Sequence, residues 1–341
     1  MLKKVLIIIC FFFVYGQACP QAGNAVYSFL DLPISSRQAA LGSSNVSLRD
    51  NDINFALMNP ALLTQETKNT IGVNIANYLS DITFGSAIYG YSIDDKSFMA
   101  VGMQYVDYGK FDGRDDLDSE TGLFSAKDMS LSVVYARTLT NRITVGATLK
   151  PVFSVFEMYT SFGMAADLGV SYRDTTGNFS AGFVLRNIGT QLKGYYADED
   201  GQHYERLPFN VMLGVSKKLE HAPFRFSLTL HNLQRWNLSY LTDDSDDDDA
   251  DAGIGFFDMA FRHAIIGVEF VPGKNFYLAA SYNHRRSKEL AMSGFKSMSG
   301  FSFGGGVKLY KFQIGFGLTP FQTGITAYQF SISTSLKEFG L

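Results

Sequence analysis

The feature that most constrains this chain is a long series of segments in which apolar and polar residues alternate. The segment 142–150, RITVGATLK, puts its apolar residues on one face and its polar or small residues on the other. The segments 207–218, 224–232 and 325–336 repeat the pattern. A period of two residues predicts β-strands. A soluble β-sandwich would show the same period, so the alternation alone leaves two all-β folds open.

Strand length and strand number favour a transmembrane antiparallel β-barrel. Many alternating segments run for about nine to eleven residues or more, the length that a tilted strand needs to cross a bilayer, whereas soluble strands have about five or six. The predicted strands number about fourteen, and bacterial outer-membrane barrels have even numbers. The strands centre on Val73, Ala87, Val101, Val133, Ala147, Ala166, Gly182, Leu213, Leu228, Val268, Ala279, Val307, Gly315 and Ser331.

The connections between the predicted strands are sorted by length. Those after even-numbered strands are short, for example 94–95, 140–141 and 310–311. Several of those after odd-numbered strands are long, namely 108–126, 189–206, 235–261 and 286–299. Short turns at one rim and long loops at the other are typical of outer-membrane barrels, whereas a sandwich has no reason to sort its loops. The pattern predicts that the N-terminus lies in the periplasm and the long loops lie outside the cell.

The start of the chain predicts export. Residues 1–18, MLKKVLIIICFFFVYGQA, have the basic start, apolar run and small-residue end of a secretory signal peptide. Cys19 follows directly and suggests lipid attachment, but Gly16 stands where a lipidation motif prefers leucine. Cleavage removes Cys10, which excludes an intramolecular disulfide. No other apolar run approaches the roughly eighteen residues of a membrane helix, so membrane insertion requires a barrel.

Composition agrees with this class. The 32 Gly, 30 Phe and 18 Tyr suit barrel walls and aromatic girdles, although a large β-sandwich could also contain them. A net charge of −4 gives no basic footprint for nucleic acid. We therefore expect an outer-membrane barrel at 70–341 that binds membrane lipid and no nucleic acid.

Residues 23–63 differ from the rest because they show no sustained alternation. Pro33 occupies a plausible first helical position, and a short helix at 37–41 would end at Gly42. A second short helix is expected at 54–57, before Asn59-Pro60 breaks the chain. We predict that an N-terminal segment, 22–69, forms an internal plug containing short helices. The alternative is a periplasmic arm beneath the barrel.

The faces of the strands predict what the plug contacts. A charge on the lipid face at the midplane costs roughly 2–4 kcal/mol, so Arg142, Lys150, Arg225 and Glu269 should point into the lumen. A lumen lined with charged and small residues must be filled by water or by polypeptide. The plug segment is the natural filling.

No catalytic chemistry is evident in the sequence. The histidines are scattered singly and lack metal-ligand spacing: His203, His221, His231, His263 and His284. No HExxH, CxxC or GxSxG motif occurs, and Gly304–Gly306 is not followed by a Lys-Ser pair. We therefore expect no enzymatic activity and no cofactor.

An acidic run, DDSDDDDAD at 243–251, is the sharpest local motif. A calcium loop would use Asp247, Asp249, Asp251 and Asp258, but Ala252 stands where such a loop needs glycine. A solvated surface loop is the simpler interpretation. Nearby Trp236 suits an aromatic anchor at headgroup level. The alternative to a solvated loop is a loop that docks a partner through Trp236, Asp243, Asp246, Asp247, Asp248 and Asp249.

The opening stretch carries a family resemblance. AGNAVYSFLDLPISSRQAALG at 22–42 and DNDINFALMNPALL at 50–63 closely resemble the N-terminal signature of the PorQ family of the Bacteroidota type IX secretion system. The likeness continues more loosely through Tyr89–Tyr91 and the barrel pattern. PorQ and its sibling PorV are similar to the long-chain fatty-acid transporter barrels, which carry an N-terminal plug.

The resemblance implies an outer-membrane scaffold without catalytic residues. Such a scaffold holds the surface protein PorZ in an attachment complex that also contains the sortase PorU and PorV. This complex processes cargo and attaches it to surface lipopolysaccharide. The rival hypothesis is a transporter for hydrophobic small molecules such as long-chain fatty acids. That hypothesis predicts an apolar pocket between plug and wall, and a strand kink, for example at Pro151. A passive porin is disfavoured because a plug would block it.

Overall fold

A computed structural model describes residues 25–50, 52–78, 81–114, 119–198, 201–238, 255–273, 275–290, 298–322 and 325–340. The predicted signal peptide, Cys19 and the acidic run at 243–251 lie outside these residues. Within the described part of the chain, no helix is long and apolar enough to cross a membrane.

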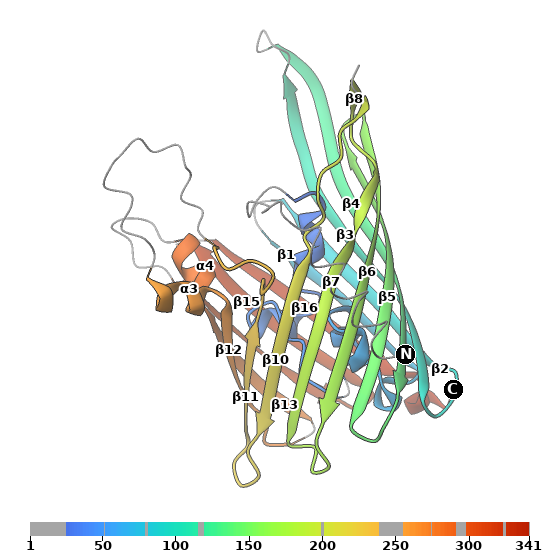
Figure 1. The fold of residues 1–341 in the computed structure, drawn as a ribbon, viewed down its shortest axis with the longest axis vertical. Coiled ribbons are helices and arrows are strands. Elements are labelled where there is room, and N and C mark those ends of the chain that lie inside the picture. The colour runs from blue at the N-terminus through green and yellow to red at the C-terminus, as the bar shows by residue number, and fades with distance from the viewer. Residues whose placement is uncertain are drawn as a thin grey trace, which may run out of the picture.

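Fourteen antiparallel strands close into one barrel, as predicted (Figure 1). The strands are β1 (Thr70–Asn77), β2 (Thr83–Ser92), β3 (Ser97–Arg114), β4 (Glu120–Thr138), β5 (Ile143–Phe156), β6 (Tyr159–Arg173), β7 (Phe179–Lys193), β10 (Asn210–Lys218), β11 (Phe224–Leu230), β12 (Ala264–Phe270), β13 (Phe276–Asn283), β14 (Phe301–Leu309), β15 (Phe312–Gln322) and β16 (Ile325–Ser335). Each predicted strand centre falls within one of them. β1 pairs with β16, with Thr70 opposite Ser335, so the sheet has no free edge and its backbone groups are paired within the wall.

Alternation along the strands separates a lipid face from a lumen face. Val73 and Ile75 are exposed on β1, whereas Asn74 between them is buried in the lumen. Lys150 and Glu269 also point inward and are buried, as predicted. The prediction for Arg142 was wrong. This residue lies exposed in the turn before β5, where it stays hydrated and needs no lumen partner.

The N-terminal segment lies inside the barrel as a plug rather than beneath it (Figure 1). Its helices are η1 (Ser28–Asp31), α2 (Ser36–Ala40), η2 (Ile53–Leu57), η3 (Pro60–Leu62) and η4 (Gln65–Thr67). α2 begins at Ser36, with Ser35 as its N-cap, so Pro33 precedes the helix instead of starting it. Gly42 ends α2 with a positive φ of 86°, a conformation that glycine adopts without strain. The predicted break at Asn59 is confirmed, since Asn59 caps η3.

The plug runs from the outer rim to the periplasmic rim. Near its start, the amide of Val26 donates to the carbonyl of Arg206, at the outer end of the wall, over 2.9 Å. Near its end, Glu66 pairs with Arg173 beside a short periplasmic turn at 3.1 Å. β1 starts at the rim that carries the short turns, as the loop pattern predicted. The expectation that the N-terminus lies there does not hold for the first described residues.

The wall is much taller on one side than on the other (Figure 1). β3 has 18 residues and β4 has 19, whereas β11 and β12 have 7 each. The predicted long loop at 108–126 is therefore mostly strand, because the two strands of this hairpin continue to pair as far as Arg114 and Glu120. The other long connections also carry structure: β8 (Ala197–Asp198), β9 (Gly201–Gln202), α3 (Phe256–Arg262) and α4 (His284–Glu289).

Lumen-facing glycines let the plug backbone approach the wall. A Cβ atom on Gly182 would collide with the carbonyl oxygen of Val46, and one on Gly317 would collide with the carbonyl oxygen of Ser36. Both obstacles are backbone atoms, which cannot rotate away. The abundance of glycine thus reflects the filled lumen as well as the wall.

We expect Gly182→Ala to destabilise the folded protein by about 1–3 kcal/mol, because the added methyl group overpacks the plug against the wall. Gly273→Ala is the matched control, since nothing lies within 4 Å of its added Cβ. The measurement is the temperature at which the folded, heat-modifiable band is lost on gels. Equal temperatures for the two variants would contradict the close approach.

Candidate functional site

A buried ion cluster joins the plug to the wall. Arg37 of α2 is 5% exposed, and its Nε donates to Glu269 of β12 over 2.9 Å. Its Nη2 pairs with Asp50 at 2.8 Å, and Asp52 lies 3.9 Å from Nη1. Arg225 of β11 completes the cluster, with Nε 2.7 Å from Glu269 and Nη1 3.3 Å from Asp50. Two guanidinium groups therefore face three carboxylates across the boundary between plug and wall.

The cluster holds the plug because its charges cannot separate without remaining buried and unpaired. Removing one partner of a buried pair typically costs about 3–5 kcal/mol. The guanidinium of Arg37 also lies 4.6 Å from the ring centroid of Tyr277, on β13. The sequence predicted the inward orientation of Arg225 and Glu269 but not their partners. The signal was present, because Arg37, Asp50 and Asp52 are charged residues in a segment predicted to be buried.

A second cluster fastens the outer part of the plug. Lys150 pairs with Asp167 at 2.8 Å and donates to Asn187 over 2.6 Å. A β-bulge in β7, where Asn187 has a φ of 56°, turns both Arg186 and Asn187 inward. Arg186 lies 3.5 Å from Asp31 of η1. The bulge thus aims two consecutive side chains at the plug.

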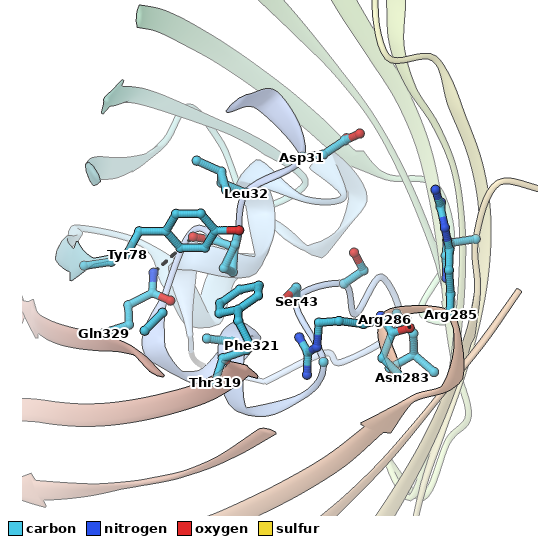
Figure 2. A pocket seen from close by; sticks show the side chains of 18 of the residues that line it. Asp31, Leu32, Ser43, Tyr78, Asn283, Arg285, Arg286, Thr319, Phe321 and Gln329 are labelled. Atoms are coloured by element: carbon cyan, nitrogen blue, oxygen red, sulfur yellow. Dashed lines mark hydrogen bonds between the residues drawn. The ribbon is translucent and has the colours of Figure 1, made fainter. Parts of the chain in front are cut away.

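A cavity of about 270 Å³ lies above the plug at its outer end (Figure 2). Its lining is mixed: Asp31, Leu32, Ser43, Tyr78, Asn283, Arg285, Arg286, Thr319, Phe321 and Gln329. Gln329 donates to the carbonyl of Pro33 over 3.0 Å, which ties β16 to the plug. Burial lowers the pKa of Arg286 to about 10, so its guanidinium is charged at neutral pH. Arg286 donates to Ser302 over 2.6 Å and so braces the cavity wall.

A second cavity, of about 560 Å³, lies between the start of the plug and the tall wall. Its lining is mostly aromatic and includes Tyr27, Tyr108, Phe156 and Tyr195. Three of the lining hydroxyls have partners: Tyr108 donates to Asp128 over 2.7 Å, and Tyr195 and Tyr27 bond to serines of the wall. The rings therefore present apolar faces, which suit a small apolar molecule.

The predicted docking residues are only partly described. Trp236 lies at the low outer rim, 54% exposed, with its ring stacked on His263 at 5.5 Å. The other predicted docking residues lie outside the described residues: Asp243, Asp246, Asp247, Asp248 and Asp249. The docking prediction therefore stays a prediction.

Of the four residues predicted to bind calcium, the structure describes only Asp258. Asp258 is already engaged, because it pairs with His284 at 2.8 Å and with Arg262 at 2.9 Å. Asp247, Asp249 and Asp251 lie outside the described residues. Among the residues that the structure describes, no group of three or more His, Cys, Asp or Glu side chains could hold a metal ion.

Comparison with known families gives one match. The family described as "Type IX secretion system protein PorV" matches residues 21–224, more than half of the chain. This range includes the whole plug and the tall side of the wall. No curated protein sequence matches the chain significantly.

Solved structures show the same fold at low sequence identity. The Pseudomonas putida toluene transporter TodX is 12% identical, with 89% of this chain and 97% of that chain covered and a TM-score of 0.53. The Ralstonia pickettii toluene transporter TbuX is 11% identical, with 89% and 98% covered and a TM-score of 0.52. A Pseudomonas aeruginosa FadL homologue is 9% identical, with 89% and 98% covered and a TM-score of 0.51. These likenesses establish the barrel fold.

We expect Glu269→Gln to destabilise the protein by about 3–5 kcal/mol, because two buried guanidinium groups lose a shared carboxylate. The plug amides around α2 should also exchange their hydrogens faster. Glu338→Gln is the control: its partner Lys308 lies 3.1 Å away, both side chains are about 40% exposed, and such pairs contribute at most about 1 kcal/mol. Similar melting temperatures and exchange rates for both variants would show that the cluster does not hold the plug.

Proposed function

Because the chain belongs to the family of the type IX secretion system protein PorV, we propose that it serves this system as a scaffold that anchors a surface partner. The family and the barrel fold place the protein in the outer membrane with a role in type IX secretion. The scaffold role is our proposal, and it includes no catalytic step.

The filled lumen supports a scaffold over an open channel. The plug is tied to the wall by the Arg37 cluster near the periplasmic ends of β11 and β12, and by the contacts of Arg186 and Asn187 with Asp31 nearer the outer rim. A barrel held rigid from inside keeps its outer rim in one arrangement. A preorganised surface loses less entropy when it binds a partner.

The observation that carries the proposal is the tall wall of β3 and β4. A strand crosses the bilayer with about nine to eleven residues, so roughly eight residues of each of these strands extend outside the membrane. This extension carries exposed apolar side chains on both faces of the hairpin: Phe111, 41% exposed, lies opposite Phe124, and Leu123, 67% exposed, points to the other face. The Phe111 and Phe124 rings stack at 5.3 Å. Apolar groups above the membrane have no lipid to cover them, which suits a protein partner.

The partner's identity is proposed from the family resemblance. The segments 22–42 and 50–63 resemble the PorQ signature, and in that family the scaffold holds a surface protein PorZ beside the sortase PorU and PorV. We infer a PorQ-like scaffold with a PorZ-like partner. The family match is to PorV rather than PorQ, and it supports the secretion role.

A second candidate function is transport of hydrophobic small molecules. The aromatic cavity between plug and wall favours it, because the hydroxyls of Tyr27, Tyr108 and Tyr195 are already paired and the ring faces are apolar. Two barrels of the same fold are toluene transporters. The β4–β5 pairing is also interrupted at Pro151, although its register is the same on both sides of the gap. The ion clusters that hold the plug weigh against this function.

The test is recovery of partners with a C-terminally tagged protein from mildly solubilised outer membranes. We expect a surface protein in near-equal amount, and about tenfold less of it with Phe111→Ser/Leu123→Ser, because truncating central apolar contacts typically costs more than 1 kcal/mol. Tyr310→Ser is the matched control. Tyr310 is 85% exposed at the periplasmic rim and should leave recovery unchanged.

Recovery of the barrel alone would contradict the scaffold proposal. Bound fatty acids or aromatic compounds in that preparation would favour the transporter, which uptake of hydrophobic molecules by cells with and without the gene would then test. A full set of partners with the double variant would overturn the assignment of the docking surface to β3 and β4.

A further inference from the structure

The barrel wall is too short to cross the bilayer beside helix α3. β11 and β12 have 7 residues each, so at about 3.3 Å per residue and a tilt of about 45° they rise about 16 Å along the membrane normal. The apolar band of an outer-membrane barrel is about 25 Å tall. Phe224 and Phe270, with ring centroids 5.4 Å apart, mark its periplasmic edge on these strands. The outer edge of the apolar band therefore falls at the level of α3, which lies between β11 and β12 in the chain.

Helix α3 turns an apolar face away from the barrel. Among the described residues, Phe256, Phe257 and Phe261 are 68%, 76% and 53% exposed. On the opposite side Met259 is buried, and its sulfur accepts a hydrogen bond from the amide of Leu238 over 3.3 Å. Residues 257 and 261 are four apart and so share one face. Three large exposed aromatic side chains on a two-turn helix mark contact with another apolar phase.

The aromatic face of α3 is continuous with the lipid face of the wall. The ring of Phe261 meets that of His284 at 6.0 Å, and His284 lies 6.1 Å from Tyr282. Tyr282 lies 5.0 Å from Phe301, its partner across β13 and β14 on the outer surface. The rings thus form one unbroken band from the wall to the helix. Figure 1 shows α3 beside the outer end of β12, far below the tips of β3 and β4.

A polar clasp fixes the direction of this face. Asp258 of α3 pairs with His284 of α4 at 2.8 Å and lies 3.7 Å from Lys288 of the same helix. Arg262, one turn along α3, pairs with the same carboxylate at 2.9 Å. The hydrogen bond from His284 lowers the pKa of Asp258 to about 2, so the carboxylate stays ionised at neutral pH. The helix therefore holds its phenylalanines outward.

We propose that α3 and Trp236 form an interfacial anchor that lies in the outer leaflet of the outer membrane, with the three phenylalanines of α3 against the acyl chains. Trp236 packs against Phe256 in a tilted arrangement, with 5.2 Å between ring centroids, and is half exposed. Tryptophan favours the boundary between headgroups and acyl chains. The anchor completes the apolar band where the wall is short. This inference rests on the outer-membrane location and does not require the scaffold role.

Fluorescence quenching in vesicles tests the anchor, because Trp236 is the only tryptophan of the chain. The protein is reconstituted in phosphatidylcholine that is brominated near the headgroup end of its acyl chains, and iodide serves as the aqueous quencher. Trp236→Phe/Phe257→Trp moves the reporter to the face of α3. Trp236→Phe/Leu123→Trp moves it to the tall wall and is the matched control. A heat-modifiable band on gels shows that each variant is folded.

The anchor predicts that brominated lipid removes most of the fluorescence at positions 236 and 257, whereas iodide has little effect there. The reporter at 123 should show the reverse, with quenching by iodide and none by lipid. If the reporter at 257 responds to iodide and not to lipid, α3 faces water or a protein and the anchor is overturned. The partner-recovery experiment is independent of this result, since it tests the opposite side of the rim.

Discussion

The buried charge cluster around Arg37 is the interaction on which the rest of the structure depends. Strands that turn apolar side chains to lipid must turn polar ones inward, and a closed ring of them encloses a polar lumen. The plug fills that lumen and supplies Arg37, Asp50 and Asp52, while the wall supplies Arg225 and Glu269. Because these charges are largely buried, each needs an opposite charge beside it. The lumen is thereby closed, and recognition of other molecules passes to the rims and the outer cavities.

The uneven height of the wall gives the two sides of the rim different surroundings. On the tall side, β3 and β4 carry apolar side chains above the membrane, where lipid does not reach them and a protein partner would cover them. On the low side, β11 and β12 end within the apolar band, and α3 occupies the remaining height with phenylalanines facing outward. Exposed apolar side chains therefore indicate a protein partner on the tall side and lipid on the low side, because the two groups lie at different heights relative to the membrane.

Much of the fold could be predicted from the sequence, because barrel strands carry a local signal. A period of two residues identified all fourteen strands, and it gave the inward direction of Lys150, Arg225 and Glu269. The lack of that period identified the plug. The extension of β3 and β4 through 108–126 was missed, because these residues mix polar side chains and glycines with isolated apolar side chains, and the alternation disappears. Arg142 was misplaced because a periodic pattern does not show where a strand begins.

The sequence by itself determined the barrel, the orientation of its faces and the presence of a filling segment, since these follow from the polarity of neighbouring residues along each strand. Only the tertiary structure decided which charges meet, how high each part of the wall rises and where α3 points its phenylalanines. Arg37 and Glu269 are 232 positions apart, and nothing local to either residue specifies the other. Their pairing follows from closure of the barrel around the plug, which brings distant charges together in a largely buried space.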